Sequence, residues 1–250
     1  MKTKKIIVAG CLVREGIYSR AAGREEPRIR AAKRRASTEA QQRINARYSW
    51  EKLELMLAAN FVPGDLVITQ TYDDEHLPED RTGALAKLKK FRKDLSTARA
   101  ERGEEMRMIW ATEHKLGDGR WHHHCVINAT PSGSDYAEIL RLWPWGSNIE
   151  IRPLIVAGEK TYESLARYMT KEARERPGLR SWSCTRNCRK PEVETFPVPD
   201  DEQLDVPEGA TVLEEQTKRT EFAEYQYVKF LATDPRQLRR RRPRKTKRKP

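Results

Sequence analysis

The sequence predicts an α+β fold in which helices cover one face of an antiparallel sheet. Short runs rich in β-branched residues alternate with longer stretches whose apolar residues recur at helical spacing. An Asp-Gly pair at 118–119 joins two of the short runs, as in a tight hairpin. Pro-Gly pairs end two of the helical stretches and so mark boundaries between elements.

The N-terminal part is predicted to hold one strand and a helical arm. Residues 6–13 are β-branched and short, as expected of a strand or an extended arm. Ser37 or Thr38 can cap a helix that runs to about Asn60, and the Pro-Gly pair at 63–64 ends it.

The middle of the chain is predicted to alternate strands and helices. The order is strand, helix, strand, strand, helix, strand and helix, at 66–72, 84–100, 106–113, 121–128, 135–142, 148–156 and 161–175. This order is the split β-α-β, or ferredoxin-like, arrangement. It predicts an antiparallel sheet with helices on one face and the other face free for a ligand.

The C-terminal part is less regular. Residues 217–231 fit either a strand pair or a helix, and the basic run at 236–249 predicts a disordered tail. We divide the chain into a basic N-terminal arm and helix, a main domain, a C-terminal extension with an acidic loop, and a disordered basic tail, at 1–60, 61–190, 191–234 and 235–250.

The formal charge of +12 is concentrated at the two ends of the chain. Residues 235–250 carry +10 and residues 1–47 carry +9, so the remainder carries −7. Positive ends on an acidic body indicate a polyanionic partner gripped by the termini. Solubility alone would explain the same pattern equally well.

The four cysteines are scattered, which is typical of reduced thiols in a cytosolic protein. No apolar run approaches the ~18 residues of a membrane-spanning helix. The apolar segment before Cys11 is also shorter than the ~7–15 residues of a signal peptide. We therefore expect a cytoplasmic protein with no membrane partner.

The predicted hairpin gathers a set of metal-binding residues. A two-residue turn at 118–119 pairs Glu113 with His124 and brings His122 to the same face, with His123 pointing away. Two imidazoles and a carboxylate can hold a divalent ion such as Mg, Mn or Zn. A loop longer by one residue would instead place Glu113 opposite His123.

The last predicted helix carries a candidate nucleophile. Tyr168 and Lys171 are three residues apart and share a helix face, so the ammonium group can favour the phenolate form. Phenolate is a competent nucleophile. Tyr162 lies roughly 120° away around the helix, so packing is its better interpretation. An isolated helical tyrosine would more often be packing too.

Three segments in order resemble the motifs of rolling-circle replication initiators of the HUH endonuclease superfamily, particularly the bacterial plasmid and filamentous-phage type. Residues 66–73 look like the first motif, and 122–127 look like the His-hydrophobic-His motif. Residues 168–171 look like the tyrosine motif in its single-tyrosine form. The resemblance spans about 66–176.

The resemblance implies cleavage of single-stranded DNA at a replication origin in a bacterial host. His122, His124 and Glu113 would hold Mg or Mn, and Tyr168 would attack the phosphorus with support from Lys171. The products would be a 5′-phosphotyrosine link and a 3′-OH that primes synthesis. Because the chain shows no helicase phosphate loop, a host helicase and polymerase are the expected partners.

Basic and aromatic side chains are the expected DNA contacts, and binding should weaken with salt. The arginines expected to contact DNA are Arg120, Arg167, Arg239, Arg240, Arg241 and Arg242. Five tryptophans could stack unpaired bases, although packing is favoured for at least three of them: Trp110, Trp121, Trp143, Trp145 and Trp182.

Other functions fit parts of the same pattern. A non-catalytic module could bind single strands on a ferredoxin-like sheet, but the aromatic signature of RNA-recognition modules is absent. A zinc hydrolase needs three protein ligands and a water, and would leave Tyr168 and Lys171 without a role. A transposase or relaxase of the same superfamily is the third alternative, although relaxases usually carry the tyrosine before the histidines.

Overall fold

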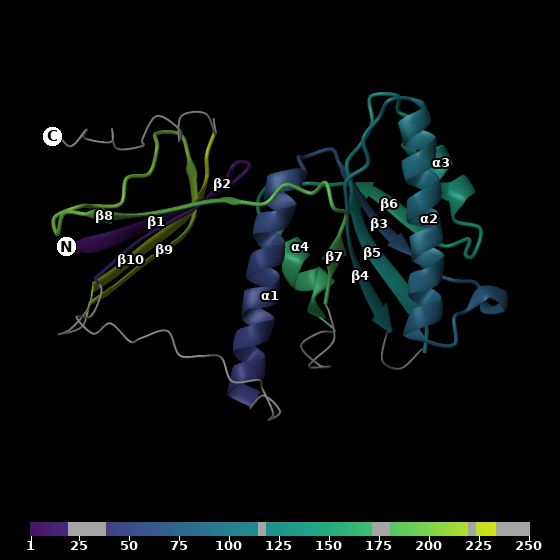
Figure 1. Cartoon of the computed structure of the whole chain (residues 1–250), viewed down its shortest axis with the longest axis horizontal. Coiled ribbons are helices and arrows are strands. Elements are labelled where there is room, and N and C mark those ends of the chain that lie inside the picture. The colour runs from purple at the N-terminus through teal and green to yellow at the C-terminus, as the bar shows by residue number, and fades with distance from the viewer. Residues whose placement is uncertain (20–38, 115–118, 172–180, 220–223, 234–250) are drawn as a thin grey trace, which may run out of the picture. The chain divides into compact units, whose positions relative to one another are not determined.

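The computed structural model describes residues 1–19, 39–114, 119–171, 181–219 and 224–233 (Figure 1). The chain divides into a terminal unit, Met1–Ala32 with Lys190–Pro250, and a central unit, Lys33–Arg189. Each unit has its own five-stranded antiparallel sheet. The predicted α+β class is therefore confirmed, with a second sheet that was not predicted.

The sheet of the central unit has the strand order β6-β3-β5-β4-β7. Its strands are β3 (Leu66–Gln70), β4 (Met108–His114), β5 (Trp121–Ile127), β6 (Ile149–Pro153) and β7 (Ser183–Cys184). The helices of this unit are α1 (Glu39–Asn60), α2 (Arg81–Glu101), α3 (Asp135–Leu142) and α4 (Tyr162–Met169), with a 3₁₀ turn η1 (Asp74–His76).

Helices cover both faces of this sheet, and not one face as predicted. Helices α2 and α3 lie on one side, whereas α1 and α4 lie on the other (Figure 1). The physical reason is that the strands are apolar on both faces. Ile68 and Cys125 are buried against α2, while Ile109 and Val126, on the opposite face, are also fully buried. A sheet that is apolar on both faces needs cover on both.

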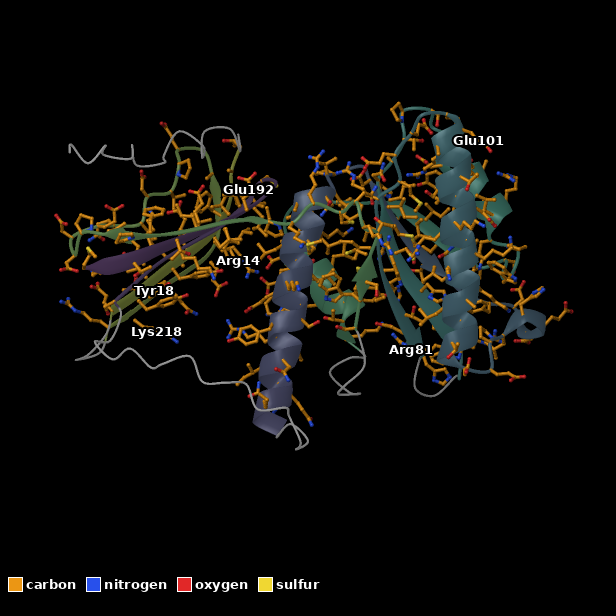
Figure 2. All side chains as sticks on the ribbon, in the orientation of Figure 1. Arg14, Tyr18, Arg81, Glu101, Glu192 and Lys218 are labelled. Atoms are coloured by element: carbon orange, nitrogen blue, oxygen red, sulfur yellow. The ribbon has the colours of Figure 1, made fainter. Side chains whose placement is uncertain are left out.

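A long amphipathic helix, α2, covers the first face. Arg81 and Glu101 mark its two ends (Figure 2). Asp80 caps the first turn by accepting a hydrogen bond from Gly83 N at 2.7 Å. Leucine and phenylalanine side chains spaced three and four residues apart point into the core: Leu88, Phe91 and Leu95.

The terminal unit joins the two ends of the chain in one sheet. Its strand order is β8-β1-β2-β10-β9. The strands are β1 (Lys2–Ala9), β2 (Leu12–Ser19), β8 (Glu192–Val198), β9 (Thr211–Arg219) and β10 (Glu224–Leu231). We expected residues 1–60 and 191–234 to be separate segments, and their strands pair instead.

The predicted single strand at 6–13 is wrong. The chain reverses after Ala9, which pairs with Leu12, and Gly10 has a φ of 58°. This left-handed conformation suits glycine, because it has no Cβ. Of the two alternatives for 217–231, the strand pair is correct, with β9 and β10 antiparallel. The predicted tail at 235–250 lies outside the described residues.

The described residues include no helix that is both long and apolar enough to span a membrane.

A buried ion pair joins α2 to α3. Arg99 Nη2 lies 2.8 Å from Asp135 Oδ1, and Arg99 has no exposed surface. Asp135 also accepts the backbone N–H of Thr130 at 2.8 Å. Burial lowers the pKa of Arg99, while the carboxylate of Asp135 opposes that shift.

Replacing Asp135 with alanine should lower the free energy of unfolding by about 3–5 kcal/mol, because it leaves a buried guanidinium without its counter-ion. Asp94→Ala is the control, since Asp94 forms an exposed pair with Lys90 at 2.7 Å. It should change stability by no more than about 0.5 kcal/mol. Urea unfolding measures both, and equal losses would contradict the assignment.

Candidate active site

The hairpin of β4 and β5 determines which side chains share a face. Glu113 pairs with His122, and Ala111 pairs with His124. The predicted pairing of Glu113 with His124 is thus wrong by two residues. Because side chains alternate with a period of two, this shift keeps Glu113, His122 and His124 on one face.

Glu113 and His124 are in direct contact on the face that α4 covers. His124 Nε2 lies 3.2 Å from Glu113 Oε2, and both residues are buried. His124 Nδ1 lies 3.3 Å from the hydroxyl of Thr69, its neighbour on β3. An N–H at Nε2 donating to the carboxylate leaves Nδ1 free to accept the threonine hydroxyl proton.

Sequence reasoning gave Thr69 no role. A signal was present, because Thr69 is one of two polar residues at the end of an otherwise apolar strand. Finding its partner required the pairing of β3 with β5, which brings residues 55 positions apart together.

The predicted nucleophile lies against this pair. A capping box between Thr161 and Ser164 begins α4, which presents Tyr168 to the sheet. The rings of Tyr168 and His124 are 4.8 Å apart, edge to face, and Tyr168 is 40% exposed. A phenol in this position is reachable by a large substrate.

Lys171 connects the two halves of the site. Its Nζ lies 4.3 Å from the centre of the Tyr168 ring and 3.4 Å from Glu113 Oε2. The ammonium group therefore contacts both the predicted nucleophile and the predicted metal ligand. Such a charge above an aromatic face is attractive by about 0.5–2 kcal/mol.

The donor set suits a divalent cation but is not a preformed cage. Nowhere in the described ranges do three His, Cys, Asp or Glu residues meet in metal-binding geometry. Glu113 Oε1 is nevertheless buried and accepts no hydrogen bond among the described residues. His122 stands opposite Glu113 on the same face of the sheet. An oxygen with unused acceptor capacity beside imidazoles fits Mg or Mn.

His123 points to the other face, as predicted. It is fully buried, with Nε2 2.6 Å from the hydroxyl of Tyr72 and Nδ1 2.9 Å from that of Thr112. Burial lowers the pKa of His123 to about 3, and the neighbouring His124 and His122 contribute to that shift. His123 is therefore a neutral core histidine. Burial also raises the pKa of Tyr72.

Tyr162 belongs to the core, as its spacing predicted. It is 2% exposed, and its hydroxyl donates to the carbonyl oxygen of Phe61 at 2.7 Å. A tyrosine held in this way cannot reach a substrate.

The two described arginines expected to contact DNA already have partners within the protein. Arg120 binds the carbonyl oxygen of Tyr72 at 3.1 Å and the carboxylate of Asp74. Arg167 pairs with Glu163 at 2.7 Å and lies 4.0 Å from the ring of Trp50. Arg239, Arg240, Arg241 and Arg242 lie outside the described residues.

Most of the tryptophans pack in the protein, as favoured from the sequence. Trp110, Trp121 and Trp143 belong to the core beneath α2. Trp143 also donates its indole N–H to the carbonyl oxygen of Thr71 at 2.9 Å. Trp145 and Trp182 are only partly buried.

Comparison with known proteins gives a family match over the central unit. Residues 65–173 match the model of a family of replication-associated proteins, the ORF2 type. This range covers less than half of the chain and contains every element from β3 to α4. It also contains Glu113, His122, His124, Tyr168 and Lys171. No curated protein and no solved structure gives a significant match. The match supports a replication initiator that acts on DNA.

Tyr72→Phe should lower the free energy of unfolding by about 1–3 kcal/mol, because it leaves buried His123 without a hydroxyl partner. Tyr48→Phe is the matched control, since Tyr48 is 65% exposed. Chemical denaturation measures both variants, and the core role of Tyr72 would be refuted by identical midpoints.

Proposed function

We propose that the chain is a metal-dependent, site-specific single-stranded DNA endonuclease and strand transferase that initiates rolling-circle replication. The observation that carries this proposal is the partly exposed Tyr168 in contact with both His124 and Lys171. The match to replication-associated proteins over the same residues supports it.

The chemistry is a transesterification at phosphorus. The hydroxyl oxygen of Tyr168 forms a bond to the scissile phosphorus while the bond to the 3′-oxygen breaks. The phenol loses its proton to water, and the departing 3′-oxygen takes one up. The products are a 5′-phosphotyrosine and a 3′-OH that can prime synthesis.

Lys171 serves the attacking group. Its ammonium lies against the Tyr168 ring, so it favours the phenolate over the neutral phenol. It also offsets charge that accumulates on the phosphate oxygens during the reaction. Its ion pair with Glu113 keeps it near the sheet while half of its side chain remains exposed.

Glu113, His124 and His122 would hold the divalent ion, Mg or Mn. When bound, such an ion supplies positive charge that stabilises the scissile phosphate. His124 is oriented for this role by the hydroxyl of Thr69, as the outer partners of metal-binding histidines commonly are.

The covalent link also explains strand transfer. A phosphotyrosine ester keeps the free energy of the cleaved bond, so the 3′-OH of a later strand can attack it and release Tyr168. Unwinding and synthesis would come from a host helicase and polymerase in the bacterial cytoplasm.

Tyr168→Phe should abolish the covalent species formed with a single-stranded origin oligonucleotide, and it should leave binding affinity within about twofold. A denaturing gel detects the adduct after incubation with Mn. Tyr162→Phe is the control, although its lost hydrogen bond to Phe61 should lower stability by about 1 kcal/mol. An adduct that survives in Tyr168→Phe would overturn the assignment of the nucleophile.

Glu113→Gln should weaken Mn binding by roughly 10–100-fold, because it removes a charged ligand from the predicted set. Glu101→Gln, at the end of α2, is the control for the same chemical change outside the site. Electron paramagnetic resonance of free Mn measures both affinities without DNA. Equal affinities in the two variants would remove Glu113 from the ligand set.

A further inference from the structure

A pocket of about 400 Å³ opens directly beside Tyr168. Its walls come from β3, β6, α4 and the segment between β6 and α4. Tyr168 is itself one of the lining residues, so the pocket and the candidate active site share one side chain. A volume of this size falls within the ~300–1,000 Å³ range of small-ligand sites.

The sheet order separates the pocket from the metal-binding residues. The pocket lies over β3 and β6, whereas Glu113 and His124 lie on β4 and β5. Tyr168 therefore stands between them. A phosphate at the tyrosine hydroxyl would have the carboxylate and imidazole on one side and the pocket on the other.

The lining combines apolar and cationic groups. Val67, Ile155 and Leu165 supply apolar walls, and Arg152 and Lys160 supply positive charge. No carboxylate lines the pocket among the described residues. Arg152 pairs with Glu150 at 3.4 Å, but both side chains are more than half exposed. Such a pair contributes little, so Arg152 can turn to a phosphate.

A nucleotide matches this lining. A nucleobase offers flat apolar faces to aliphatic and aromatic walls, and its backbone phosphate is drawn to the two cations. Ile155 is 46% exposed at the edge of the pocket, so it offers apolar surface that a base can cover. An uncharged apolar ligand would leave Arg152 and Lys160 without a role.

We infer that this pocket binds the base of the nucleotide next to the scissile phosphate and so contributes to the sequence preference of cleavage. The inference rests on the proposed function for its biological meaning. Binding itself can be measured without cleavage, so the two can fail separately.

The test compares two probes on the full chain in EDTA: a 12-mer of thymidine and an abasic strand with the same number of phosphates. Ile155→Ala should weaken binding of the thymidine strand by about threefold and leave the abasic strand unchanged. Leu140→Ala, an exposed leucine on α3, is the matched control and should affect neither strand.

Lys160→Ala should weaken both strands alike, because it removes a phosphate contact. The slope of log affinity against log salt should become shallower by about 0.7, the value for one phosphate of a single strand. A loss confined to the thymidine strand would mean that Lys160 contacts the base instead, and would overturn its phosphate role.

The pocket inference is overturned if Ile155→Ala weakens the two strands equally or has no more effect than Leu140→Ala. If the covalent adduct forms but Ile155→Ala shows no dependence on the base, only the pocket is refuted. If the dependence on the base is seen and no adduct forms with any DNA, the pocket stands as a nucleotide site and the nicking chemistry is refuted.

Discussion

The candidate site depends on the buried carboxylate of Glu113. A charged group in this position costs several kcal/mol of desolvation unless it is paired. One of its oxygens lies 3.2 Å from His124 Nε2 and 3.4 Å from Lys171 Nζ. The need to pair this carboxylate therefore draws the hairpin and the residues that follow α4 together. Tyr168 is placed in the site as a consequence, between the imidazole and the ammonium group.

Much of this site could be predicted from the sequence, because the side chains of a strand alternate. The expected pairing of the hairpin was wrong by two residues, yet Glu113, His122 and His124 still share a face. An error of one residue would have turned Glu113 away from the histidines. The helix spacing of Tyr168 and Lys171 was equally informative, since local geometry alone places them together. Thr69 escaped notice because its role depends on a strand far away in sequence.

The parts of the fold that could not be predicted involve distant pairing. Apolar residues at 66–68 and 125–127 are continuous, and such runs cannot show by periodicity that helices cover both faces. The strand at 6–13 hid a turn, because Gly10 and Cys11 interrupt the β-branched run only briefly. The terminal sheet was out of reach for a related reason. Nothing in the local pattern of β1 indicates that β8, almost two hundred residues later, is its neighbour.

The sheet made from segments on either side of the central unit has a consequence for synthesis on the ribosome. The hairpin of β1 and β2 emerges before the central unit, but two strands alone are marginally stable in water. Its partners β8 and β10 emerge only after the whole central unit. The nascent hairpin must therefore wait with unpaired edges while the unit that carries Tyr168 completes its own fold. The order of translation thus allows the catalytic half to mature before the second sheet is closed.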